Sequence, residues 1–170
     1  MSNLVLIGLK NAGKTSTSIK LAKDLGYQVL DTDVLLVAKY NQLHRKPVNK
    51  ITDIYLEVGE QQFRDLEYTV VKEHKDIENT IFATGGGTII NPKCWPVLKN
   101  MGTNIFLYLD KSTFISRILI EKNINYLRNR DLFDIYNFRQ KIYEQLADIT
   151  INVSKLSIDD ICHTIKQKMR

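Results

Sequence analysis

"LVLIGLKNAGKTST", residues 4–17, joins an apolar strand to a glycine-bounded loop and then to the start of a helix. Residues 8–15 follow the pattern G-x-x-x-x-G-K-[ST], in the strand, loop and helix context that this pattern requires. Its glycines let backbone N–H groups curve around an anion, and the helix N-terminus adds partial positive charge. We therefore predict that residues 8–15, called the phosphate-binding loop below, hold a nucleoside triphosphate.

Two side chains of the phosphate-binding loop have chemical roles that follow from the pattern. Lys14 reaches the β- and γ-phosphate oxygens, and the hydroxyl of Thr15 binds Mg²⁺. The other predicted contacts with the nucleotide come from Gly8, Asn11, Ala12, Gly13 and Ser16.

Strand and helix patterns alternate along the rest of the chain. Apolar runs rich in β-branched residues predict strands at 3–8, 27–33, 80–85, 104–109 and 149–153. Helical patterns lie at 12–25, from 59 to about 74, at 92–100, from 112 to about 122 with Ser112 as N-cap, and at 157–170. The alternation predicts a doubly wound α/β fold, with about five parallel strands, helices on both faces, and ligands at the carboxyl ends of the strands.

The composition suits a single domain over residues 1–170, because 44% of the residues are hydrophobic and 25% are charged. No apolar run approaches the roughly 18 residues of a membrane span and no signal-peptide pattern opens the chain, so we expect a cytoplasmic protein without a membrane partner. Cys94 and Cys162 lie far apart and predict neither a disulfide framework nor a metal site. The formal charge of +5 is spread along the chain, which argues against nucleic acid and is explained by anionic small molecules.

Two segments do not fit the alternation. Residues 42–52 are polar, and residues 123–134 are charged and weakly periodic. Each is a candidate mobile cover over a site. The C-terminal helix, by contrast, has an apolar face that predicts packing on the core, formed by Ile158, Ile161, Ile165 and Met169.

Asp31 and Asp33 stand at the end of the second predicted strand, at the sheet edge where ligands gather. In this position Asp31 would hold a Mg²⁺-bound water, and Asp33 would hydrogen-bond an acceptor hydroxyl and take its proton during attack. A second interpretation, in which the aspartates only cap a helix from Val34 onward, fits the spacing equally well.

A glycine triplet, Gly85, Gly86 and Gly87, ends the third predicted strand at the same edge. Three consecutive glycines are costly in chain entropy, so we expect close approach of the backbone to a ligand. Arg64 and Glu67 are three residues apart on one helix face, which lets the carboxylate orient the guanidinium. On its own, such a pair is more often a solvated surface ion pair.

In this order, the phosphate-binding loop, "DTD", "GEQQFRDLE", "ATGGGTII" and "FRQKIYEQLAD" resemble the shikimate kinase family, from Leu4 to about Val153. Adenylate, gluconate and other small kinases share the first motif but not this set. The resemblance implies a P-loop kinase fold with an acceptor-binding segment at about 33–62 and a mobile lid at about 123–134. It also implies transfer of the γ-phosphate of MgATP to the 3-hydroxyl of shikimate, in aromatic amino-acid biosynthesis.

The resemblance further implies roles for individual residues. Arg64 and Arg139 match the two arginines of the family that bind the shikimate carboxylate, and bidentate guanidinium forks suit that task. Glu67 would hold Arg64 in place. The ring hydroxyls of shikimate would meet Asp33 and the backbone of the glycine triplet.

The lid and the nucleotide side depart from the family's pattern. Where the family has R-P-L-L, this chain has "RDLF" from residue 130, so Arg130 is the preferred arginine for the transferred phosphate and Arg128 is the alternative. Arg117 lies a residue or two before the family's adenine-side arginine, and Leu119 stands at the aligned position.

Two other interpretations stay open. One is a kinase for another hydroxylated carboxylic acid, such as quinate or gluconate, and the other is a nucleotide-binding relative without catalysis. The presence of both aspartates and both arginines favours an active kinase, which we expect to act on shikimate and ATP as a monomer.

Overall fold

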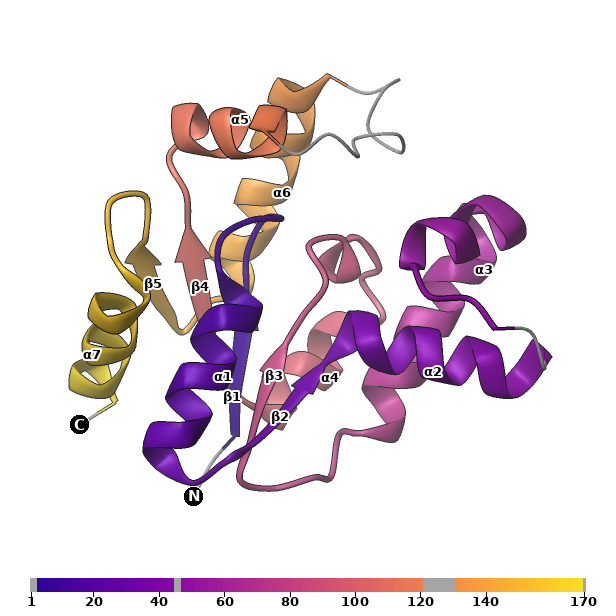
Figure 1. Ribbon diagram of the computed structural model, residues 1–170, viewed down its shortest axis with the longest axis horizontal. Coiled ribbons are helices and arrows are strands. Elements are labelled where there is room, and N and C mark those ends of the chain that lie inside the picture. Colours follow the sequence, from indigo (N-terminus) through magenta and orange to yellow (C-terminus); the bar gives the residue numbers. More distant parts are fainter. Residues whose placement is uncertain (1–2, 45–46, 121–130, 170) are drawn as a thin grey trace.

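The computed structural model describes residues 3–44, 47–120 and 131–169. These residues form a five-stranded, all-parallel sheet with the strand order β2-β3-β1-β4-β5 (Figure 1). The strands are β1 (Asn3–Ile7), β2 (Gln28–Asp31), β3 (Thr80–Ala83), β4 (Gly102–Tyr108) and β5 (Ile149–Asn152). The predicted parallel α/β sheet is confirmed, and each predicted strand is present.

Helices cover both faces of the sheet (Figure 1). On one face α1 (Lys14–Leu25) packs against α7 (Ile158–Lys168), and on the other α4 (Cys94–Met101) lies against β1 and β4. The remaining helical elements are α2 (Thr32–His44), α3 (Ile51–Glu73), the 3-10 turn η1 (Thr88–Ile90), α5 (Lys111–Ile120) and α6 (Leu132–Leu146). None of the helices in the described ranges is long and apolar enough to cross a membrane.

The central strand β1 organises the sheet. All five of its residues are buried, as expected for a parallel strand that is covered on both faces. It pairs with β3 on one side and β4 on the other, so that Leu4 is in register with both Ile81 and Thr103. The segments that follow β1, β2 and β3 therefore meet at one edge, and they carry the phosphate-binding loop, the two aspartates and the glycine triplet.

The helix that the sequence predicts from Gly59 begins earlier, at Ile51. Gly59 has φ 78° and ψ 172°, which glycine adopts at low cost, and this non-helical residue kinks α3. The prediction is correct for the part after the kink and wrong for the part before it. The ends of the expected cover at 42–52 are helical, because residues 42–44 close α2 and residues 51–52 open α3.

The sequence patterns indicate no helix over 132–146, yet α6 occupies this range. Asp131 is its N-cap, because the Asp131 carboxylate accepts a hydrogen bond of 2.7 Å from the backbone N–H of Phe133. Residues 132–134, at the end of the predicted lid, form the first turn of α6. The remainder of the predicted lid up to residue 130, with Arg128 and Arg130, lies outside the described residues.

Three predicted helix ends are corrected. Helix α1 begins at Lys14 rather than at residue 12, and it ends at the predicted glycine cap, Gly26, with φ 70°. Ser112 is the second residue of α5 and not its N-cap. Met169 caps α7 and is 39% exposed, whereas the other three residues of the predicted apolar face are buried or partly buried.

Candidate active site

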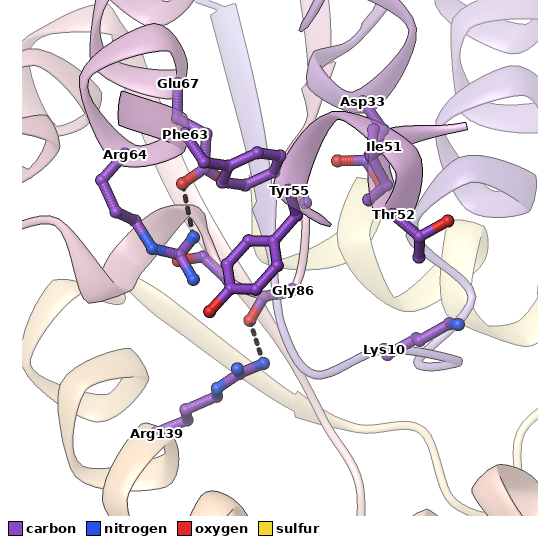
Figure 2. A pocket seen from close by; sticks show the side chains of 12 residues that line it. Lys10, Asp33, Ile51, Thr52, Tyr55, Phe63, Arg64, Glu67, Gly86 and Arg139 are labelled. Carbon is purple, nitrogen blue, oxygen red and sulfur yellow. Dashed lines mark hydrogen bonds and ion pairs between the residues drawn. The ribbon is translucent and has the colours of Figure 1, made fainter. Parts of the chain in front are cut away.

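A cavity of about 150 Å³ opens at the carboxyl edge of the sheet (Figure 2). Side chains that the sequence analysis singled out line it, namely Asp33 from α2, Arg64 and Glu67 from α3, and Arg139 from α6, together with the glycine triplet. The other lining residues are Lys10, Ile51, Thr52, Tyr55 and Phe63. The small volume and the mixture of apolar walls with charged groups suit a small anionic molecule.

The phosphate-binding loop has the backbone geometry of an anion site. Gly8 and Gly13 have φ of 153° and 87°, which residues with side chains rarely adopt, and a Cβ on Gly8 would lie 2.7 Å from the carbonyl oxygen of Leu107. The Nζ of Lys14 donates hydrogen bonds to the carbonyl oxygens of Gly8 and Leu9, at 2.8 and 2.9 Å. The ammonium group therefore lies against the backbone of the phosphate-binding loop, next to the phosphates that it is predicted to bind.

Lys14 is only 8% exposed. Its burial lowers the pKa of the ammonium from 10.5 to about 8, against the opposing effect of the Asp33 and Asp31 carboxylates. The group is therefore mostly protonated at neutral pH and able to bind phosphate oxygens.

Thr15 and Asp31 place two side-chain oxygens close together at the end of the phosphate-binding loop. The Thr15 hydroxyl donates a hydrogen bond of 2.7 Å to Oδ2 of Asp31, while Oδ1 of Asp31 accepts one of 2.9 Å from the backbone N–H of Asp33. Asp31 thus caps α2, which begins at Thr32 rather than at Val34, so the capping interpretation is correct for Asp31 and wrong for Asp33, which lies inside the helix.

This pair fits Mg²⁺ as a nucleotide-bound ion. Mg²⁺ prefers oxygen ligands, and at phosphate sites it is held by one or two protein groups together with phosphates and water. The described residues contain no cluster of three or more His, Cys, Asp or Glu side chains that would hold a metal by themselves. A hydroxyl and a carboxylate beside the phosphate-binding loop suit a Mg²⁺ ion that is held jointly by the protein and the phosphates of the nucleotide.

Asp33 is one of two acidic residues that line the cavity, and Glu67, the other, is hydrogen-bonded to Arg64. Burial of Asp33, followed by the negative charge of Asp31, raises the pKa of its carboxyl above 3.8, while Lys14 and Lys10 act in the opposite direction. A carboxylate with a raised pKa is a better proton acceptor than an ordinary surface aspartate.

Each residue of the glycine triplet leaves room for a neighbouring part of the protein. A Cβ on Gly85 would overlap Oδ1 of Asp33, one on Gly86 would lie 2.9 Å from the backbone nitrogen of Lys10, and one on Gly87 would lie 3.0 Å from Nη1 of Arg64. The sequence predicts that the glycines let the backbone approach a ligand closely. In the structure, their missing side chains leave room for Asp33, Lys10 and Arg64, which themselves line the cavity.

In the Arg64–Glu67 pair the glutamate is buried and the Arg64 side chain is only 14% exposed, so this is not a solvated surface ion pair. Nη1 of Arg64 donates to the Glu67 carboxylate and, at 3.1 Å, to the carbonyl oxygen of Gly87. The Glu67 side chain is 5% exposed, and burial raises its pKa despite Arg64 and a hydrogen bond of 3.2 Å from the Thr88 hydroxyl. Nε of Arg64 is also buried and has no hydrogen-bond partner among the described residues.

Arg139 supplies the second guanidinium group. Its Nη1 donates a hydrogen bond of 2.9 Å to the carbonyl oxygen of Gly86, and the residue is 8% exposed. Figure 2 shows Arg64 and Arg139 extending toward Gly86, with Asp33 across the cavity from Arg139. We call the end with the two guanidinium groups, where Glu67 is bound to Arg64, the cationic end, and the end with Asp33 the acidic end.

Three aromatic residues in or beside the site were not predicted from the sequence. Tyr55 and Phe63 form a wall of the cavity, with their rings edge to face at 5.3 Å and 73° (Figure 2). Tyr143 donates to the carbonyl oxygens of Gly8 and Gly86. Phe63 and Tyr143 stand in the quoted motifs beside Arg64 and Arg139, whereas Tyr55 lies in the unpredicted first part of α3.

Arg117 lies against the phosphate-binding loop. Its Nη1 donates a hydrogen bond of 2.8 Å to the carbonyl oxygen of Asn11, whose side chain donates one of 3.4 Å to the carbonyl oxygen of Arg117. Leu119, at the aligned family position, is 64% exposed. Of the other predicted nucleotide contacts, Ala12 is buried and Ser16 is exposed at the start of α1.

Comparison with known proteins agrees with this geometry. The family model that matches residues 10–170 describes shikimate kinase. A shikimate kinase of Xylella fastidiosa (strain 9a5c) is 32% identical over 159 residues, covering 91% of this chain and 84% of that protein. One from Macrococcus caseolyticus is 33% identical, covering 87% and 85%. The solved shikimate kinase from Acinetobacter baumannii in complex with shikimate has a TM-score of 0.88 and 28% identity, covering 99% of this chain and 93% of that one.

Proposed function

The chain belongs to the shikimate kinase family, and from that membership we propose how its site transfers the γ-phosphate of ATP to the 3-hydroxyl of shikimate, giving ADP and shikimate 3-phosphate. One observation carries the proposal. Arg64 and Arg139 line a small cavity beside the phosphate-binding loop, and Asp33 lies in the same cavity. This arrangement suits an acceptor with a carboxylate at one end and a reactive hydroxyl at the other.

The cationic end of the cavity binds the acceptor's carboxylate in this proposal. Guanidinium groups bind carboxylates with two parallel hydrogen bonds, and Arg64 is already oriented by Glu67 and Gly87. The buried Nε of Arg64, which lies 4.0 Å from Oε1 of Glu60, adds a donor that makes no hydrogen bond among the described residues. Tyr55 and Phe63 supply an apolar wall for the carbon ring of the substrate.

At the acidic end, Asp33 acts as the base. Its carboxylate takes the proton of the attacking hydroxyl while that oxygen bonds to the γ-phosphorus and the bond from this phosphorus to the β-phosphate oxygen breaks. Burial favours this role because it raises the pKa of Asp33.

Lys14 binds the β- and γ-phosphate oxygens by exchanging its carbonyl partners for phosphate. Mg²⁺ bound with ATP would neutralise negative charge on the phosphates, and Thr15 and Asp31 would hold this ion. Arg117 and the backbone of the phosphate-binding loop complete the nucleotide side. We assign the remaining cation, for the transferred phosphate, to Arg130, with Arg128 as the alternative. Separate Arg130→Ala and Arg128→Ala variants test this, because only the correct one should lower kcat strongly.

We further propose that the protein acts as a monomer, because Asp33, Arg64, Arg139 and Lys10 of the phosphate-binding loop in one chain already line the proposed acceptor cavity. A cytoplasmic location accords with the two cysteines, which are both free and buried. Size-exclusion chromatography of the active protein tests the first point.

The deciding experiment is a coupled assay of ADP formation with the purified chain, MgATP and shikimate. We expect ADP formation that depends on shikimate and exceeds turnover with quinate or gluconate. Faster turnover with either of those acids would make the protein a kinase of a different acceptor. Calorimetric binding of ATP and shikimate without any product would instead indicate a non-catalytic relative.

A further inference from the structure

Tyr143 forms hydrogen bonds with the phosphate-binding loop and with the glycine triplet, which the proposed function assigns to the two substrates. Its hydroxyl donates to the carbonyl oxygen of Gly8, in the phosphate-binding loop, at 2.7 Å, and to the carbonyl oxygen of Gly86, in the glycine triplet, at 2.8 Å. A phenol carries one hydrogen, so the two carbonyls share it. Both loops are therefore held within hydrogen-bond distance of a single oxygen atom.

The tyrosine oxygen is itself held rigidly. Tyr143 is fully buried, and its ring stacks on that of Phe106 from β4, with the centroids 4.9 Å apart and the planes 19° from parallel. An aromatic side chain has only two rotatable bonds, and both are restrained by this packing. The hydroxyl is thus a fixed point between the loops.

The contacts of Tyr143 continue to the cations on both sides. The Gly8 carbonyl also accepts a hydrogen bond of 2.8 Å from Lys14, and the Gly86 carbonyl accepts one of 2.9 Å from Arg139. An unbroken series of hydrogen bonds therefore runs from the predicted phosphate ligand to the predicted carboxylate ligand. Arg139 and Tyr143 are four residues apart on α6, so the same helix positions both.

We propose that Tyr143 is a positioning residue that sets the spacing between the nucleotide and the acceptor; this rests on the proposed function. Phosphoryl transfer needs the attacking oxygen and the γ-phosphorus at a defined distance and in line with the leaving oxygen, and small misplacements are costly. Tyr143 touches neither substrate in this scheme. It acts through the backbone of the two loops that hold them.

The test is the Tyr143→Phe variant. Phenylalanine keeps the ring and its stacking on Phe106, and before the substrates bind each carbonyl keeps its second donor, Lys14 or Arg139. We expect kcat to fall about tenfold while the KM values for shikimate and ATP each change by less than about threefold. A role in folding alone would lower thermal stability without this separation of kcat from KM.

Tyr136→Phe is the matched control. Tyr136 lies on the same helix and is 6% exposed, and its hydroxyl donates a hydrogen bond of 2.8 Å to the carbonyl oxygen of Leu109, which does not line the cavity. We expect this variant to lose a comparable amount of thermal stability and to keep kcat. If both variants lower kcat equally, or if Tyr143→Phe keeps wild-type kcat, the proposal is wrong.

A second substitution keeps the proposal testable if the Tyr143→Phe variant folds poorly. Tyr143 replaced by 4-aminophenylalanine has two N–H donors, one for each carbonyl, and should keep kcat within about threefold of wild type. Loss of kcat with this donor-bearing residue would contradict the proposal. The wild-type chain is measured in parallel, because absence of shikimate-dependent ADP formation there would count against the proposed function rather than against the role of Tyr143.

Discussion

Oδ1 of Asp33 occupies the space in which a β-carbon on Gly85 would stand. Asp33 is in the first turn of α2, directly after β2, and Gly85 follows β3, the strand that pairs with β2. The two residues are 52 positions apart in the chain, yet the absence of a side chain at one makes room for the carboxylate of the other. Asp33, the proposed base, can therefore hold its carboxylate in this position only because residue 85 has no side chain.

Gly85→Ala should therefore lower kcat by about 100-fold, because the new methyl group displaces the Asp33 carboxylate. Steady-state kinetics of Gly85→Ala, Asp33→Asn and the double variant measure this. Since both changes act on the same carboxylate, the double variant should be little slower than Asp33→Asn alone. Additive losses would show that Gly85 acts through another group.

Arg64→Lys and Arg139→Lys should each raise the KM for shikimate roughly tenfold or more, because lysine keeps the charge but loses the two-pronged hydrogen bonding. The KM for ATP should change little. Arg117→Lys is the contrasting variant, since Arg117 contacts Asn11 of the phosphate-binding loop and should affect the KM for ATP instead. The reverse pattern would exchange the roles assigned to these arginines.

Asp31→Asn and Thr15→Val should raise the Mg²⁺ concentration needed for half-maximal rate, because each removes one of the paired oxygen ligands. The rate is titrated with Mg²⁺ at fixed ATP, and removal of divalent ions with a chelator should stop turnover in wild type and variants alike. Asp33→Asn serves as the control, with a lower kcat but an unchanged Mg²⁺ midpoint. An unchanged midpoint for Asp31→Asn would remove Asp31 from the metal site.

Cys94 should resist thiol reagents in the native protein at pH 8. It is fully buried, and this burial, with a smaller effect of the Glu67 charge, raises the pKa of its thiol from 9.0 to about 12. The unfolded chain releases this proton first as the pH rises, so the contribution of Cys94 to the free energy of unfolding falls from about pH 9 toward pH 12. Labelling with a chromogenic disulfide, before and after denaturation, measures the protection, and rapid labelling of native Cys94 would contradict it.

The sequence predicted the parts of the site whose signals are local. The phosphate-binding loop is recognisable because strand, glycines, lysine and helix are adjacent in the chain, and the two aspartates follow directly on the next strand. Helix α6 and the first part of α3 were missed. The kink at Gly59 interrupts the helical period of α3, and the first turn of α6 lies in the segment that the sequence assigned to a mobile cover.

The amino-acid sequence is enough to determine the parallel α/β sheet and the phosphate site at its carboxyl edge. The sheet follows from the spacing of apolar residues, and the phosphate site follows from the backbone freedom of glycine. The tertiary structure alone decided that Glu67 is buried against Arg64, that Gly85 accommodates Asp33, and that Tyr143 bridges Gly8 and Gly86. These relationships join segments separated by tens of residues. They depend on the order in which the strands assemble, which places side chains from four different helices and loops around one cavity.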